Sequence, residues 1–175
     1  MRILGLDPGS LHTGYGLIEK RGSTLLALEA GRFSCAADLP LPDRLAELAA
    51  SVAELLARTL PDLAVLEAPF LGKSSRSLIV LAQARGALLA TIAGRGVAIR
   101  EYSPAEVKMA VTGSGRADKG QVSRMVRLLL ALKAEERLAK DATDALAVAI
   151  CGAQRLRLDR LAALPPAAAR SVEKA

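Results

Sequence analysis

The sequence predicts an α/β fold in which one mixed β-sheet is flanked by α-helices on both faces. The first observation is size, because 175 residues are typical of one domain and 51% hydrophobic residues can fill a sizeable core. The second is the order of segments, in which three consecutive strands precede alternating helices and strands. Strands joined by tight turns pair antiparallel and strands joined by helices pair parallel, so both kinds of pairing are expected in one sheet.

Three strands are predicted at the start of the chain. The apolar run over residues 2–6 ends in Asp-Pro-Gly, which marks a turn. Residues 15–20 and 24–33 read as two strands around the tight connection Arg21-Gly22-Ser23. These strands supply the antiparallel part of the sheet.

Helices and strands alternate in the rest of the chain. A helix is predicted from Leu41, with Pro42 in its first turn and apolar residues at helical spacing, until Pro61 ends it. The further elements are a strand over 63–66, a helix over 74–93, a strand over 97–102 and helices over 104–111, 119–132 and 140–156. We expect a single domain over residues 1–158 and a flexible C-terminal tail over 159–175, which carries a Pro-Pro pair and an alanine run.

Composition excludes several classes of protein. A chain with 51% hydrophobic and 24% charged residues is not intrinsically disordered as a whole. Its most apolar stretch, 77–94, is interrupted by Gln83 and Arg85, so no membrane span is expected. The chain starts with a strand instead of a signal sequence, and Cys35 and Cys151 are too far apart for a zinc or redox motif. We therefore expect a reduced, cytoplasmic protein.

Positive charge is concentrated in the middle of the chain. The formal net charge is +6, and between Lys73 and Arg127 ten basic residues stand against three acidic ones. A concentrated positive field favours a polyanionic partner such as nucleic acid. The alternative is a solvated basic surface without a partner.

Four carboxylates stand where acidic residues are unusual. Asp7 and Glu67 each close an apolar strand, and Asp141 and Asp144 share one face of the last helix beside its apolar stripe. Two strand ends and one helix turn can meet at a single edge of the sheet. Clustered carboxylates repel one another and lose hydration, and divalent cations compensate for this. An all-oxygen site suits Mg²⁺ or Mn²⁺, and two such ions roughly 4 Å apart support phosphodiester cleavage.

Each acid also has a simpler interpretation. Asp7 can start a turn, and Glu67 can pair with an arginine at the rim of the sheet. Asp141 can be a helix N-terminal acid, and Asp144 can be an exposed partner of Lys140, four residues away. Jointly, however, the four acids and the basic middle of the chain favour a metal-dependent nuclease.

Four stretches of the sequence resemble the RuvC family of Holliday-junction resolvases. These are Ile3-Leu-Gly-Leu-Asp-Pro-Gly9 with Thr13-Gly-Tyr-Gly16; Leu81-Ala-Gln-Ala-Arg-Gly86; Thr112-Gly-Ser-Gly-Arg-Ala-Asp-Lys119 with Gln121-Val122 and Met125-Val126; and Asp141-Ala-Thr-Asp-Ala-Leu-Ala147. The first stretch also resembles the opening of sugar kinases and actin-like ATPases, which need two such domains. The four stretches in this order are specific to the resolvases.

The resemblance implies a fold, an activity and a set of partners. The family has a ribonuclease H-like fold and acts as a homodimer that nicks two like-polarity strands of a four-way DNA junction. It uses Mg²⁺ or Mn²⁺, leaves 5′-phosphate and 3′-hydroxyl ends, and cooperates with the RuvA–RuvB branch-migration complex. The family's four catalytic and metal-binding acids fall on Asp7, Glu67, Asp141 and Asp144, and some members have His at the position of Asp141.

The resemblance also points to residues that contact DNA. Lys108 and Lys119 match family lysines near the cleaved strand, although either can be a solvated helix lysine. Phe70 matches a family aromatic that either stacks on an unpaired base or anchors its loop. Arg76 and Arg116, in the basic middle of the chain, are further candidates.

Two other functions stay open from the sequence. The first is a non-catalytic module that binds branched DNA, which the four acids disfavour because negative charge beside phosphate gives a binder nothing. The second is a ribonuclease H-like nuclease that acts on another nucleic acid such as an RNA–DNA hybrid. The long apolar helix over 74–93 disfavours the second, because one of its faces is suited to dimerisation.

Overall fold

The computed structural model of the chain describes residues 1–68, 75–133 and 137–162. The side chains described are those of residues 1–68, 77–133 and 137–156. Phe70, the side chain of Arg76 and the predicted tail beyond residue 162 lie outside these ranges. All other residues singled out in the sequence as candidates for the site are described.

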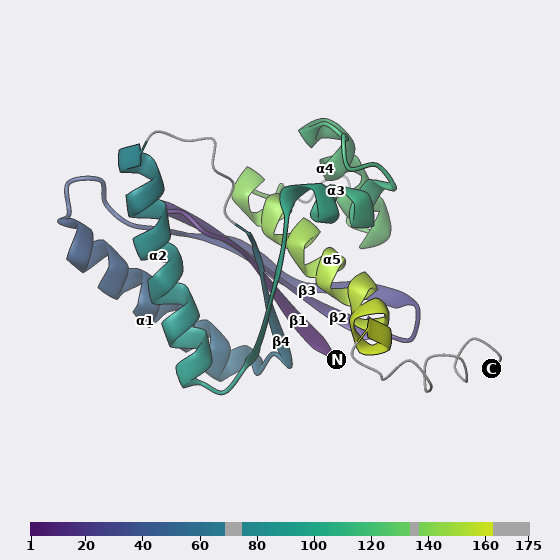
Figure 1. Cartoon of the computed structure of the whole chain (residues 1–175), viewed down its shortest axis with the longest axis horizontal. Helices are drawn as coiled ribbons and strands as arrows, with labels where there is room; N and C mark the ends of the chain where they lie inside the picture. The colour runs from purple at the N-terminus through teal and green to yellow at the C-terminus, as the bar shows by residue number, and fades with distance from the viewer. Residues whose placement is uncertain (69–74, 134–136, 163–175) are drawn as a thin grey trace.

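The centre of the fold is a five-stranded sheet with the order β3-β2-β1-β4-β5 (Figure 1). Its strands are β1 (Arg2–Asp7), β2 (His12–Arg21), β3 (Thr24–Ser34), β4 (Leu63–Glu67) and β5 (Ala98–Tyr102). The first three strands pair antiparallel, whereas β4 pairs parallel with β1 and β5 pairs parallel with β4. The predicted mixed sheet is confirmed. Helix α2 joins the parallel pair β4 and β5 directly, whereas the chain between β1 and β4 passes through β2, β3 and α1.

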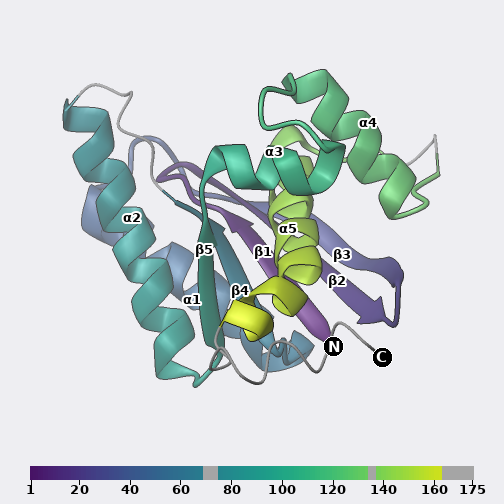
Figure 2. The same cartoon turned by 45° about the vertical axis from the view of Figure 1, so that its right-hand side comes forward.

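Helices cover both faces of this sheet (Figure 2). They are α1 (Leu41–Thr59), α2 (Ser75–Gly94), α3 (Pro104–Thr112), α4 (Lys119–Leu129) and α5 (Lys140–Ala162). Helices α1 and α2 pack against each other on one face, and α5 crosses the other face with α3 and α4 packed against it. The α/β fold with helices on both faces is therefore confirmed.

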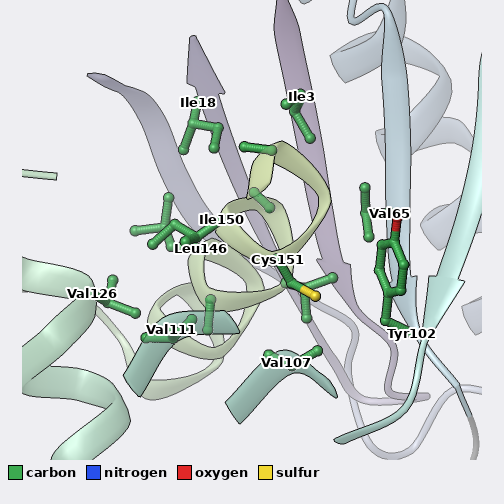
Figure 3. Packing of buried hydrophobic residues seen from close by; sticks show 14 of the residues in the cluster. Ile3, Ile18, Val65, Tyr102, Val107, Val111, Val126, Leu146, Ile150 and Cys151 are labelled. Atoms are coloured by element: carbon green, nitrogen blue, oxygen red, sulfur yellow. The ribbon is translucent and has the colours of Figure 1, made fainter. Parts of the chain in front are cut away.

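Alternate residues of the strands feed two separate cores. Ile3 of β1 and Val65 of β4 point towards α5, where they join Ile18, Leu146 and Ile150 in the core shown in Figure 3. The residues between them on these strands point the other way, into a second core with α1 and α2. Those strand residues are Leu4, Leu6, Ala64 and Leu66.

Two helix ends differ from the sequence prediction. Helix α4 ends at Leu129 instead of residue 132, because Leu130 caps it and Ala131 turns the chain with a left-handed φ of 49°. Helix α5 continues to Ala162, past the predicted end at residue 156. Neither difference moves the acids at the start of α5.

Helix α2 is the most apolar element of the chain. Its stretch Ser77–Gly94 is long and apolar enough by composition to cross a membrane, with 22% of its residues buried. Three of its residues, Ala84, Leu88 and Ile92, are fully buried against α1 and the sheet. One side of α2 therefore belongs to the domain core, while Ile79 on another side is 60% exposed.

Helix α5 lies unusually close to the sheet because glycines face it. Gly5 and Gly16 are cross-strand partners on β1 and β2. A Cβ atom on Gly5 would lie 2.1 Å from the carbonyl oxygen of Ala145, and one on Gly16 would lie 2.8 Å from the side chain of Leu146. The absent side chains let the helix backbone rest on the strands, which sets the height of its acidic first turns above the sheet.

Candidate active site

The backbone register aligns one row of residues across the sheet, at the edge where β1 and β4 end. Arg32 pairs with Gly14, and Gly14 pairs with Asp7. Glu67 of β4 stands one position beyond the Leu6–Leu66 pair, beside Asp7, and pairs with Tyr102 of β5. Because successive side chains alternate between faces, Asp7 and Glu67 both lie on the face that α5 covers. The two strand-end acids predicted from the sequence are thus neighbours.

Gly14 lets the first turn of α5 pack directly against this row of strand residues. A Cβ atom on Gly14 would lie 2.0 Å from the carbonyl oxygen of Asp141. The Asp141 backbone therefore rests directly on Gly14, between Asp7 on one strand and Arg32 on another. Asp144 follows one helical turn later on the same face of α5. The structure thus brings all four predicted carboxylates to one edge of the sheet.

The electrostatics of the site also indicate that the four acids lie close together. The pKa of Asp7 is raised from its ordinary 3.8 to about 7, chiefly by burial and then by the negative charges of Asp144, Glu67 and Asp141, in that order. Lys119 acts in the opposite direction. A carboxylate in this position lacks compensating positive charge, so a cation that binds here relieves the repulsion.

Two of the four acids are held by cations from neighbouring elements. Arg32 of β3 places Nη1 3.4 Å from Oδ2 of Asp141. Lys119 of α4 places Nζ 3.5 Å from Oδ2 of Asp144. The ion pair of Asp144 is thus made across the tertiary structure with Lys119, which differs from the interpretation that paired it with Lys140.

The donor set fits a hard divalent cation. Four carboxylates provide only oxygen ligands, which Mg²⁺ and Mn²⁺ prefer. Within residues 1–68, 77–133 and 137–156, no three acidic, histidine or cysteine side chains stand close enough together to hold an ion as they are. Two of the carboxylates pair through one oxygen each with Arg32 and Lys119, so these cations compete with a metal ion for the same two carboxylates.

A cleft opens beside the acids, between the end of β4 and helices α3, α4 and α5. Its polar lining consists of Glu67, Asp144, Lys108 and Lys119. Both predicted DNA-binding lysines are therefore in the same cleft as two of the acids. Positive side chains at the wall of an acidic cleft suit a phosphodiester, whose phosphate needs cations on several sides.

Arg116, another predicted contact residue, does not line this cleft. Arg116 lines a separate hollow, with Arg124, between the loop after α3 and helix α4. The backbone of Arg76 lies in the first turn of α2, and Phe70 belongs to the segment after β4 that the structure does not describe. His12 is exposed, and its Nδ1 lies 3.2 Å from the hydroxyl of Ser34. His12 thus stays without a catalytic assignment.

Three residues that position the acids were missed in the sequence. Arg32 and Gly14 have been described above. The third is Arg85 of α2, which is 8% exposed and donates a hydrogen bond of 2.6 Å to the backbone carbonyl of Glu67. Arg85 also pairs with the carboxylate of Glu101 on β5. Arg85 is the one charged residue of the apolar stretch Ser77–Gly94, and this was the available signal, because a buried guanidinium needs partners in the fold.

Known proteins are similar in sequence to this chain over most of its length. The sequence profile of the family described as crossover junction endodeoxyribonuclease RuvC matches residues 3–152. Crossover junction endodeoxyribonuclease RuvC of Citrifermentans bemidjiense is 40% identical over 161 residues, which are 92% of this chain and 97% of that protein.

Solved structures agree as well. Thermus thermophilus RuvC superposes with a TM-score of 0.82 at 31% identity, covering 91% of this chain and 97% of the other. The same protein in complex with Holliday junction substrate gives a TM-score of 0.82 at 29% identity, covering 90% of this chain and 96% of the other.

Proposed function

The chain belongs to the RuvC family of crossover junction endodeoxyribonucleases, and we propose that it resolves four-way DNA junctions by paired symmetric nicks. The observation that carries this proposal is the row at the sheet edge, where Asp7 and Glu67 lie under the first turns of α5 with Asp141 and Asp144. A binding module has no use for four acids beside a phosphate backbone. A nuclease needs them.

The four carboxylates are the proposed catalytic and metal-binding residues. Asp7 occupies the centre of the set, since each of the other three acids raises its pKa. When bound, two Mg²⁺ ions, or Mn²⁺ in their place, would act as Lewis acids on the attacking and leaving oxygens of a phosphodiester. The raised pKa of Asp7 supports this assignment, because burial and three neighbouring negative charges together disfavour its ionised form, which a bound cation would stabilise.

The two lysines of the cleft are the proposed phosphate-binding residues. Lys108 and Lys119 line the same wall as Glu67 and Asp144, so a phosphate in the cleft meets ammonium groups on that side. They hold the scissile phosphate and offset the charge that develops on the leaving oxygen. Water attack at phosphorus with loss of the 3′ oxygen leaves a 5′-phosphate and a 3′-hydroxyl. Arg116, which lines a separate hollow, is a further proposed DNA-binding residue, as are Phe70 and Arg76, whose side chains are not among those that the structure describes.

The proposed assembly is a homodimer formed through α2. This helix buries Ala84, Leu88 and Ile92 in its own domain but leaves Ile79 60% exposed, so an apolar face is available to a second copy. A four-way junction has approximate two-fold symmetry and needs two cuts, which an isologous dimer provides. The RuvA–RuvB branch-migration complex is the further proposed partner, and the cytoplasm, where chromosomal DNA lies, is the proposed compartment.

The test is a comparison of substrates under single-turnover conditions. The pure protein is incubated with Mg²⁺ and a labelled four-way junction, a linear duplex of the same sequence or an RNA–DNA hybrid. We expect paired nicks in the junction alone. Tight binding without any cut would favour a binding module, and cleavage of the hybrid would favour a different nuclease. The matched variants Glu67→Gln, Asp141→Asn and Asp144→Asn keep side-chain size, and each is expected to bind the junction but nick it much more slowly.

A further inference from the structure

The ion pair between Arg32 and Asp141 joins an edge strand of the sheet to a proposed metal ligand. Arg32 lies on β3, in the same cross-strand row as Gly14 and Asp7. Its side chain is 41% exposed, so the guanidinium reaches Asp141 while one part of it faces solvent. This places a positive group at the side of the acids away from Lys119, whose ammonium pairs with Asp144.

The Arg32 pair is loose compared with another arginine–carboxylate pair in the same molecule. Arg58 donates two hydrogen bonds to Glu29, of 2.6 and 2.5 Å, and Tyr15 donates a third to the same carboxylate. Arg32 makes one contact of 3.4 Å to Asp141, which is longer than the usual range of about 2.7 to 3.2 Å for a hydrogen bond from nitrogen to oxygen. The first arrangement is a fixed structural link, whereas the second is easily exchanged.

We propose that Arg32 is a phosphate-binding residue of the active site that Asp141 holds until metal and DNA arrive. The inference rests on the proposed function. In the free protein the guanidinium supplies part of the positive charge that the acids lack. A divalent cation held by Asp141 would offset the negative charge of this carboxylate, and the attraction between Asp141 and Arg32 would weaken. A guanidinium released at a DNA-facing edge binds a backbone phosphate, whose oxygens match its fork of N–H groups.

The row explains why Arg32 can take this role. Gly14 between Arg32 and Asp7 has no side chain, so nothing on β2 separates the guanidinium from the acids. With Lys119 on the opposite flank, the acids lie between two cations supplied by different elements. A DNA strand that crosses the acids therefore meets a positive group on either side, one on β3 and one on α4.

Arg32→Gln tests the proposal in two measurements. Calorimetry of the free protein with Mn²⁺ should show affinity that rises about two- to fivefold, the range expected when a partly exposed ion pair stops competing for Asp141. Junction binding, measured in Ca²⁺ at several salt concentrations, should weaken, and the slope of log affinity against log salt should fall by about one. Arg32→Lys keeps the charge and should retain the wild-type slope of log affinity against log salt. That result would show that position 32 tolerates substitution.

Arg21→Gln is the matched control. Arg21 is an exposed arginine of β2 with an ion pair of 2.6 Å to Glu19, at the hairpin far from the acids. Its removal changes the net charge equally but should leave the salt slope and the Mn²⁺ affinity unchanged. In an Asp141→Asn background, Arg32→Gln should no longer alter Mn²⁺ affinity, because the effect acts through Asp141.

Either measurement on Arg32→Gln can overturn the proposal. A wild-type salt slope or a wild-type Mn²⁺ affinity in Arg32→Gln overturns it, as does an equal effect of Arg21→Gln. Failure of the wild-type protein to nick a four-way junction would overturn the proposed function instead. The Mn²⁺ measurement needs no DNA, so the two failures are distinguishable.

Discussion

Replacing Asp7 by Asn is expected to stabilise the metal-free protein while it abolishes cleavage. The pKa of Asp7 is about 7 in the folded protein against 3.8 for an ordinary aspartate. The folded state therefore binds the Asp7 proton more tightly than the unfolded chain does. This favours folding fully below about pH 4, and the benefit is lost as pH rises through 7. At about 1.4 kcal/mol per pKa unit, the ionised carboxylate lowers the free energy of unfolding by roughly 4 kcal/mol at pH 8.

The assay is thermal unfolding in EDTA at pH 5 and pH 8. Asn keeps the size of Asp and removes the charge, so it should recover about 2 to 4 kcal/mol at pH 8. For a domain of this length that raises the melting temperature by about 5 to 15 °C. At pH 5 the difference should shrink to about 1 to 2 kcal/mol, because the cost builds by about 1.4 kcal/mol per pH unit above the ordinary pKa of 3.8. Mg²⁺ or Mn²⁺ should then stabilise the wild type and stabilise the variant much less, because binding to the folded state alone raises stability.

Activity supplies the second half of this prediction. Nicking by Asp7→Asn should drop by several orders of magnitude, while junction binding persists or tightens, since a negative charge near the DNA backbone has gone. Asp43→Asn, at an exposed acid in the first turn of α1, is the control and should change neither metal response nor nicking. Full cleavage by Asp7→Asn, or a lower melting temperature than wild type at pH 8 in EDTA, would refute the reasoning.

Three further results are expected. Lys108→Ala and Lys119→Ala should slow single-turnover nicking more than they weaken junction binding, and wild-type rates in both would remove their catalytic role. Gly14→Ala, whose Cβ would lie 2.0 Å from the carbonyl oxygen of Asp141, should displace α5 and lower both melting temperature and Mn²⁺ affinity; an unchanged Mn²⁺ affinity would contradict this. Ile79→Glu on the exposed face of α2 should yield monomers in sedimentation at micromolar concentration, and a persistent dimer would place the interface elsewhere.

The sequence predicted the acids because their signal is local. An acidic residue that closes an apolar strand, as Asp7 and Glu67 do, is visible without knowing the fold. The pair on α5 is visible from its spacing of three residues. These four acids are brought together by the parallel pairing of β1 with β4 and the docking of α5, whereas the order of elements predicted only a mixed sheet in which the acids could meet at one edge.

Arg32 could not be predicted because its place depends on an irregularity in the sheet. Near the hairpin turn, β2 and β3 pair in plain register, as between Arg21 and Thr24. A β-bulge at Leu17/Ile18 then shifts the register by one residue. Without this shift Arg32 would pair with Thr13 and point to the opposite face, since a one-residue slip reverses every side chain.

The partner of Asp144 was missed for a similar reason. Lys140 is four residues away on the same helix, so sequence spacing favours it, whereas Lys119 approaches from α4. That approach depends on how α4 packs against α5, which no local pattern encodes. Spacing rules apply to residues on the same helix and cannot predict a contact between two helices.

The close seating of α5 on β1 and β2 has a consequence for the newly made protein. Asp7 and Glu67 leave the ribosome long before Asp141 and Asp144, which belong to the last helix of the described chain. Until that helix settles over Gly5, Gly14 and Gly16, a nascent chain carries only two of the four acids of the proposed centre. Domains form as units during synthesis, so on the proposed assignment the centre for hydrolysis is completed only when the last helix docks. We therefore expect a chain stalled before α5 to leave DNA uncut.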